Sequence, residues 1–98
     1  MISRWTWNLR KDQTNRRDHG GLSLADGMPV LDGDPHQLSR PDTHPDGDRW
    51  QTIGMALDVL LLFVVHTEPD DRRDGIGRII SVRRASPQER KAYEEGAF

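Results

Sequence analysis

The sequence contains no cysteine, and this absence removes a whole group of sites from consideration. Disulfide bonds, thiolate metal sites and a cysteine nucleophile are all excluded. Long apolar runs are missing as well, because the longest one, from Val59 to Val65, is far shorter than a bilayer span and follows Asp58. No basic and apolar signal peptide opens the sequence. We therefore expect a soluble, cytoplasmic protein in which this run forms a buried central strand.

Hydrophobic residues are also few, at 34% of the 98 residues, while charged residues make up 31%. A chain of this length forms a single domain, which we assign to residues 1–98, and it buries only a modest part of its surface. The stability margin of such a domain is thin, so a partner that covers exposed surface would stabilise it. No phosphate-binding glycine loop and no serine nucleophile motif is present.

The charges are divided unevenly along the chain, although the net charge is only −2. Residues 1–17 hold five basic and one acidic residue, residues 18–48 hold one basic and seven acidic residues, and residues 49–98 hold eight of each sign. Two interpretations are open. Either the N-terminal helix and the C-terminal strand form a basic surface that suits nucleic acid, or the charges simply keep a small domain in solution.

The pattern of apolar and turn-forming residues predicts an α+β fold with an antiparallel sheet, two N-terminal helices and one C-terminal helix. The last helix has the strongest signal, because Ser86 and Glu89 form a capping box and Gly96 suits the helix end. The expected strands are 4–7, 36–40, 49–55, 58–68 and 78–85, the helices 9–18, 23–31 and 87–95, with a hairpin turn at 45–48 and a polar loop at 69–77.

Strand alternation predicts which side chains share a face. On the strand 58–68, His66 and Glu68 share the face of the even-numbered residues. Polar groups therefore gather where the last two strands end. On the strand 78–85, one face is expected to carry Ile79, Ser81 and Arg83, and the other Arg78, Ile80, Val82 and Arg84.

This collection of polar groups suits the cleavage of a phosphodiester bond in RNA. Attack by the ribose 2′-hydroxyl needs a base that takes its proton, and cations that stabilise the charge developing on the phosphate. His66 or Glu68 is the candidate base. Arg83 is the candidate phosphate clamp, because the guanidinium fork matches phosphate oxygens and stays charged.

Each candidate also has a structural interpretation that the sequence leaves open. Glu68 equally fits an ion pair with an arginine at a strand end, and His66 fits a half-buried strand residue. Glu89 has a structural role in the capping box. Core packing is the expected role of Trp5 and Trp7, with base stacking as the alternative.

A second set of side chains offers oxygen and imidazole groups of the kind that bind divalent metals. Their spacing matches no calcium loop, and prolines interrupt it. We therefore expect a solvated acidic loop, no metal site and no cofactor. The set comprises Asp34, His36, Asp42, His44, Asp46 and Asp48.

Five segments resemble, in the right order and over nearly the whole chain, motifs of the BrnT family of toxins. They are residues 15–20, similar to Asn-x-x-Lys-His-Gly; 32–35, similar to the turn after the second helix; 49–54, similar to Arg-x-x-x-Ile-Gly; 62–68, similar to an apolar strand ending in Tyr-Thr-Glu; and 78–85, similar to Arg-Ile-Ile-Ser-Ala-Arg-x-Ala.

The resemblance implies a RelE-like ribonuclease fold and a type II toxin–antitoxin system. In such a system a BrnA-type antitoxin sequesters the toxin, and the complex represses its own operon. Operator DNA is then bound only through the antitoxin, which agrees with the lack of a DNA-reading helix in this chain. The implied function is a metal-independent endoribonuclease that cleaves cellular RNA and arrests growth.

The resemblance and the clustering of polar strand ends together predict the site. Arg49 and Arg83 are expected to bind and stabilise the phosphate, and His66 or Glu68 to move protons. The residues expected to bind the RNA are Lys11, His19, Arg78 and Arg84.

Three departures from the family motifs leave a second interpretation open. Asp18 stands where lysine is usual before His-Gly, Asn8 replaces the usual aspartate, and Gly21 is an extra glycine. In this second interpretation the chain is a weakly active or inactive homologue. It would then serve as a binding module in antitoxin-mediated autorepression.

Overall fold

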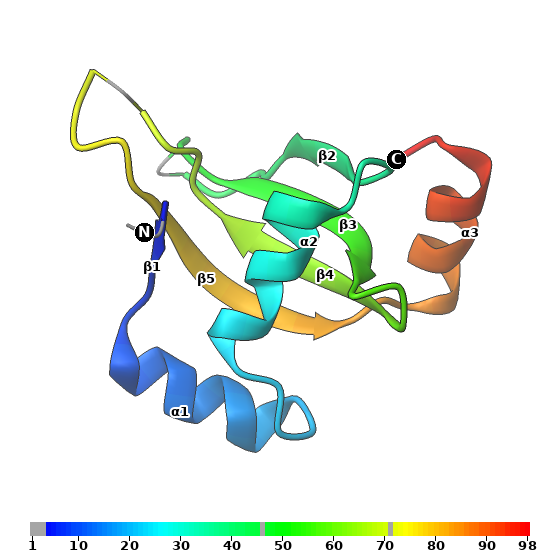
Figure 1. Ribbon diagram of the computed structural model, residues 1–98, viewed down its shortest axis with the longest axis horizontal. Coiled ribbons are helices and arrows are strands. Elements are labelled where there is room, and N and C mark those ends of the chain that lie inside the picture. Colours follow the sequence, from blue (N-terminus) through cyan, green and yellow to red (C-terminus); the bar gives the residue numbers. More distant parts are fainter. Residues whose placement is uncertain (1–3, 46, 71) are drawn as a thin grey trace.

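The computed structural model describes residues 4–45, 47–70 and 72–98, and its centre is a five-stranded sheet (Figure 1). The predicted α+β class is confirmed. In the described part of the chain no helix is long and apolar enough to cross a membrane. The elements in chain order are β1 (Trp5–Thr6), α1 (Leu9–Asp18), the 3₁₀ helix η1 (Leu24–Gly27), α2 (Met28–Gly33), β2 (Leu38–Pro41), β3 (Trp50–Ala56), β4 (Leu60–His66), β5 (Gly77–Arg84) and α3 (Pro87–Glu95).

The sheet is mixed, so the prediction of an antiparallel sheet is wrong at one edge. The strand order is β1-β5-β4-β3-β2, and β1 pairs in parallel with β5, with Trp5 opposite Gly77. The other three pairings are antiparallel. A Cβ at residue 77 would overlap the ring of Trp5, so glycine is what allows β1 to approach. No local pattern signals the direction of a pairing between the first and last strands of a chain.

β3 and β4 form a hairpin whose turn differs from the prediction. β4 begins at Leu60 rather than at residue 58, because Leu57, Asp58 and Val59 form the turn, with φ values of 53° at Leu57 and 59° at Asp58. The N–H of Val59 donates to the carbonyl of Ala56 at 3.0 Å and closes this turn. Positive φ at both central residues defines a type I′ turn, whose twist matches that of the flanking strands.

Several local predictions are confirmed. Asn8 caps α1 through a hydrogen bond from the N–H of Lys11, and the capping box at Ser86 and Glu89 begins α3. Gly96 ends α3 in the left-handed conformation, with a φ of 69°. β2 is an edge strand, as its prolines indicate. The predicted turn at 45–48 includes residue 46, which lies outside the described residues.

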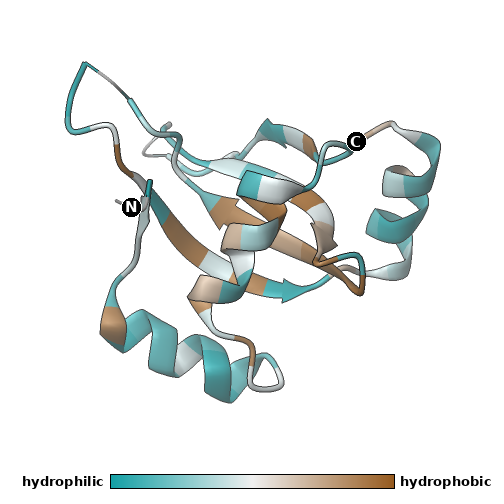
Figure 2. Cartoon of the chain, viewed as in Figure 1, coloured by the Kyte–Doolittle hydropathy of each residue, from teal (hydrophilic) through white to brown (hydrophobic). Residues whose placement is uncertain are grey.

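The second predicted helix, residues 23–31, is divided into η1 and α2. A Cβ at Gly27 would come within 3.1 Å of the side chain of Val82 and 3.2 Å of that of Val64. Glycine therefore lets this segment lie close to β4 and β5. α2 crosses one face of the sheet (Figure 1), and Figure 2 shows hydrophobic positions on the strands behind it. The buried apolar cluster consists of Trp5, Leu24, Val30, Ala56, Leu62, Val64, Ile79 and Val82.

A β-bulge in β5 overturns the predicted alternation of its side chains. Val65 pairs with Ser81 but His66 pairs with Ile79, so Ile80 is an extra residue. Ile79 and Val82, predicted to lie on opposite faces, are both fully buried in the same core cluster. Such an extra residue interrupts the two-residue period of a strand and re-aims the side chains that follow it.

Asn15 of α1 takes the place of a missing strand neighbour beside β5. Its side-chain amide accepts from the N–H of Val82 at 3.0 Å and donates to the carbonyl of Val82 at 2.8 Å. The same amide nitrogen donates to the carbonyl of Leu22 at 2.8 Å. Because β1 pairs only with the first two residues of β5, this buried side chain joins α1 to the strand beyond that point.

Candidate functional site

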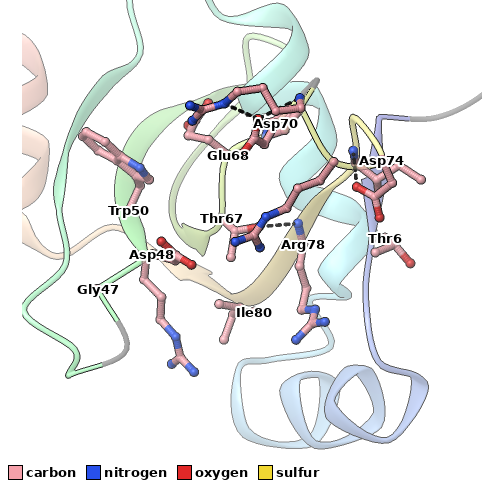
Figure 3. Close-up of a pocket in the computed structure, with 15 residues that line it drawn as sticks. Thr6, Gly47, Asp48, Trp50, Thr67, Glu68, Asp70, Asp74, Arg78 and Ile80 are labelled. Carbon is pink, nitrogen blue, oxygen red and sulfur yellow. Dashed lines mark hydrogen bonds and ion pairs between the residues drawn. The ribbon is translucent and has the colours of Figure 1, made fainter.

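Charged side chains gather in an open pocket at one end of β3, β4 and β5 (Figure 3). Its volume of about 810 Å³ lies within the range of roughly 300–1,000 Å³ that is typical of ligand sites. Cations and anions both line this pocket, so a phosphate would be bound by particular arginines rather than by a uniformly basic surface. The described charged residues that line it are Asp48, Arg49, Glu68, Asp70, Arg72, Arg73, Asp74 and Arg78.

Three of the predicted site residues meet in this pocket. Arg49 comes directly before β3, Glu68 follows β4, and Arg78 is the second residue of β5. The backbone N–H of Arg78 donates to the hydroxyl of Thr67 at 2.8 Å, and the N–H of Thr67 donates to the carbonyl of Arg78 at 2.9 Å. These bonds hold the start of β5 beside the chain segment that leads into Glu68.

The guanidinium group of Arg78 is available to a ligand. Arg78 is exposed, and its side chain makes no hydrogen bond or ion pair within the part of the chain that the structure describes. Figure 3 shows its side chain next to those of Thr67 and Ile80. In the same pocket Arg72 already pairs with Asp70 at 3.3 Å. Arg78 can thus bind a phosphate without breaking an ion pair among the described residues.

His66 lies beneath the pocket rather than in it, with a side chain only 1% exposed. Nδ1 lies 3.0 Å from the carbonyl of Thr67, which can only accept, so Nδ1 carries the proton and donates. Nε2 then accepts from the hydroxyl of Thr52 at 2.6 Å, and Thr52 accepts from Ser39 at 2.6 Å. The Oε1 atom of Glu68 lies 3.6 Å from Nδ1. The structure therefore connects His66 to Glu68, but does not present His66 to a substrate.

The buried position of His66 predicts a loss of stability in mild acid. Burial lowers the pKa of His66 from 6.5, although the Thr67 carbonyl and Glu68 oppose this. Below pH 6.5 the unfolded chain therefore binds a proton here that the folded chain does not, and the free energy of unfolding decreases as the pH falls. We expect urea midpoints to fall between about pH 7 and pH 5. In His66→Gln this fall should be smaller, and an equal fall in both proteins would contradict the assignment.

Arg83 and Arg84 lie at the other end of β5 from Arg78. Arg83 forms a two-bond fork with the carboxylate of Glu89, at 2.8 and 2.9 Å, and stacks over the ring of Phe63 at 4.0 Å. Burial alone would raise the pKa of Glu89, but hydrogen bonds from Arg83 and Ser86 outweigh it and lower that pKa. The structure thus gives Arg83 a partner in α3 and does not bring it to Glu68.

Lys11 and His19 line a second hollow, between α1 and β5, with a volume of about 500 Å³. Ile80 lines both this hollow and the first pocket. Asp18, which stands where the family usually has lysine, also lines the second hollow and pairs with Arg17 at 3.1 Å. Two predicted RNA-binding residues therefore lie next to the pocket without being part of it.

Trp50, Arg72 and Arg73 are among the pocket residues that sequence reasoning missed. Trp50 opens β3 and lines the pocket, while Arg72 and Arg73 reach it from the loop 69–77. The signal available in the sequence was the pair of adjacent arginines in a loop that follows the polar end of β4. Trp5 does pack in the core, as expected, and its ring nitrogen donates to Asp32 at 2.7 Å.

The alternative metal site is not assembled among the described residues, where no three histidine or acidic side chains could hold one ion. Asp34, a member of the predicted set, is buried and accepts from the N–H groups of His36 and Met55 and from the hydroxyl of Tyr93. Burial would raise the pKa of Asp34, but these hydrogen bonds lower it. Asp34 thus connects α2, β3 and α3. Asp46 lies outside the described residues.

A small α+β domain with arginines and carboxylates in one open pocket fits a protein that acts on a phosphate-bearing ligand. A sequence model described as "Ribonuclease toxin, BrnT, of type II toxin-antitoxin system" matches residues 7–89. The chain therefore belongs to the BrnT family of ribonuclease toxins, as its motifs predicted.

Known structures agree with this assignment. The ribonuclease toxin BrnT of Brucella abortus is similar to this chain, with 25% sequence identity and a TM-score of 0.65. The similarity covers 86% of this chain and 99% of the Brucella chain. The comparison with curated proteins gives no match.

Proposed function

We propose that this chain is a metal-independent endoribonuclease that cleaves cellular RNA and arrests growth. The observation that carries the proposal is the meeting of Arg49, Glu68 and Arg78 in one open pocket. Two guanidinium groups supply positive charge for a phosphate, and a carboxylate in the same pocket can take a proton. The RelE-like ribonuclease fold implied by the sequence motifs belongs to the same proposal.

In the proposed reaction the ribose 2′-oxygen attacks the adjacent phosphorus while Glu68 takes the 2′-hydroxyl proton. The P–O2′ bond forms and the P–O5′ bond breaks. The products are a 2′,3′-cyclic phosphate and a 5′-hydroxyl, which takes its proton from water in the open pocket. Arg49 and Arg78 stabilise the negative charge that builds up on the phosphate oxygens.

In this proposal His66 is a positioning residue and Arg83 has a structural role, and neither touches the substrate. His66 is buried with both ring nitrogens hydrogen-bonded, and lies close enough to Glu68 to orient its carboxylate. Arg83 holds α3 against the sheet through Glu89. Arg84, at the far end of β5, would contribute to RNA binding only through its charge.

The proposed partner is a BrnA-type antitoxin that covers the pocket holding Arg49, Glu68 and Arg78 and silences the toxin in the cytoplasm. Operator DNA would be bound by the antitoxin, and the complex would repress its own operon. The thin stability margin of so short a chain supports a stabilising partner of this kind.

The test is the cleavage of a defined, unstructured RNA by the antitoxin-free protein in EDTA. We expect cleavage that leaves 2′,3′-cyclic phosphate ends, detected by mass spectrometry, and no cleavage of the same sequence made with 2′-deoxyriboses. Glu68→Gln should slow cleavage by about 10²–10⁴-fold, with an unchanged circular dichroism spectrum. Cleavage of the deoxy strand, or cleavage that EDTA abolishes, would contradict the proposed chemistry.

A second candidate function is a binding module that no longer cleaves RNA. The observation that favours it is Asp18, an acidic residue beside the second hollow where the family usually has lysine. A folded native chain that leaves RNA intact at every concentration, and does not slow growth when expressed alone, would select this function over the first.

A further inference from the structure

We infer that the substrate is an extended single strand of RNA that runs from the pocket across Ile80 into the second hollow. The α1 groove is the name used below for that hollow, which is lined by Asn8, Arg10, Lys11, Thr14, Asn15, Asp18, His19, Ile80 and Ser81. This inference rests on the proposed function, because it extends the binding site of the same RNA beyond the bond that is cleaved.

The β-bulge of β5 is what joins the two hollows. Ile80 is the extra residue that the register shift introduces, and Ile80 and the next residue, Ser81, both line the α1 groove. A regular strand would turn one of these two side chains into the core. Ile80 also lines the first pocket, so a ligand can pass from one hollow to the other over a single half-buried apolar side chain.

The charges of the α1 groove suit the phosphates of such a strand. Arg10 and Lys11 are exposed, and within the described residues their side chains make no hydrogen bond or ion pair. Asp18, the acidic residue of the groove, is paired with Arg17. Two unpaired cations therefore continue the positive charge that Arg78 provides in the first pocket.

The apolar side chain of Ile80, which lines both hollows, favours a single strand of RNA over a duplex. The bases of a duplex are stacked and paired, whereas those of a single strand can turn toward the protein and lie on an apolar side chain. Ile80 offers such a side chain between two groups of cations. We assign the α1 groove to RNA rather than to a protein partner because Ile80 lines both hollows, not because of charge alone.

The experiment measures the binding of a 2′-O-methyl RNA dodecamer, which cannot be cleaved, to the full chain by fluorescence anisotropy at several salt concentrations. Each phosphate contact with single-stranded nucleic acid contributes about 0.7 to the slope of log K against log salt. In Arg10→Ala/Lys11→Ala the slope should therefore fall by about 1.4, and the affinity by about tenfold or more. Cleavage of a dinucleotide by the native chain, measured separately, reports on the first pocket alone.

The matched control is Arg90→Ala/Lys91→Ala, which removes the same charge from two exposed residues of α3, on the other side of the molecule from α1 (Figure 1). Its slope should equal that of the native chain. Equal losses in both double variants, or no loss in the α1 variant, would overturn the inference. Binding is measured on a strand that cannot be cleaved, so it tests the α1 groove whether or not the chain cleaves RNA. Cleavage of the dinucleotide tests the proposed function separately.

Discussion

Replacing Arg78 with alanine is expected to reduce ribonuclease activity by about 10²–10³-fold, the usual cost of removing one group that stabilises transition-state charge. Arg78 is exposed in the pocket, and its side chain has no partner among the described residues, so the fold should persist. The hydrogen bonds between Thr67 and Arg78 use only the backbone groups of Arg78, which alanine retains. The measurement is the rate of cleavage of a defined RNA in EDTA, beside a urea unfolding curve for each protein.

Arg83→Ala is the informative comparison, because sequence reasoning predicted Arg83 as the phosphate clamp. In the structure Arg83 pairs with Glu89 at the other end of β5. We therefore expect Arg83→Ala to lower the urea midpoint while a folded sample keeps most of its activity. The opposite result would be a well-folded Arg83→Ala that loses its activity while Arg78→Ala keeps it. That result would move the site to the other end of the strand.

Replacing Asn15 with alanine is expected to lower the free energy of unfolding by about 3–4 kcal/mol, because it leaves a buried N–H and two carbonyls without partners. Those groups belong to Val82 and Leu22. A loss of this size is a large part of the roughly 5–15 kcal/mol that stabilises a typical domain. The measurement is urea unfolding followed by circular dichroism.

Thr14→Ala is the matched control for Asn15→Ala. Thr14 is the adjacent residue of α1, is exposed, and bonds only to the carbonyl of Arg10 in its own helix, at 3.2 Å. Its replacement should change the free energy of unfolding by less than about 0.5 kcal/mol. Equal unfolding midpoints for the two variants would mean that the Asn15 amide does not join α1 to β5.

The elements that the sequence predicted correctly depend on neighbours in the chain. The capping box of α3 needs only Ser86 and Glu89, three residues apart, and the N-cap of α1 needs only Asn8 and Lys11. Interactions of this range leave a signal in the local pattern of residue types. The family motifs extend this local information over the chain, which is why membership of the BrnT family was predictable.

The errors concern contacts between distant residues. The parallel pairing of β1 with β5 joins the first strand to the last, and the bulge at Ile80 arises only when β5 is aligned with β4. A one-residue shift of register moves the following side chains to the other face. The predicted faces of β5 were therefore wrong beyond Ile80, although the strand itself was predicted.

By itself, then, the sequence determined the α+β class, the family, and a set of charged residues suited to RNA. The tertiary structure decided which of them meet: Glu68 and Arg78 share a pocket, His66 is buried beneath it, and Arg83 is held by α3. The physical reason is that residue type fixes what a side chain can do. Strand register and burial fix which groups it can reach, and both depend on packing between segments far apart in the chain.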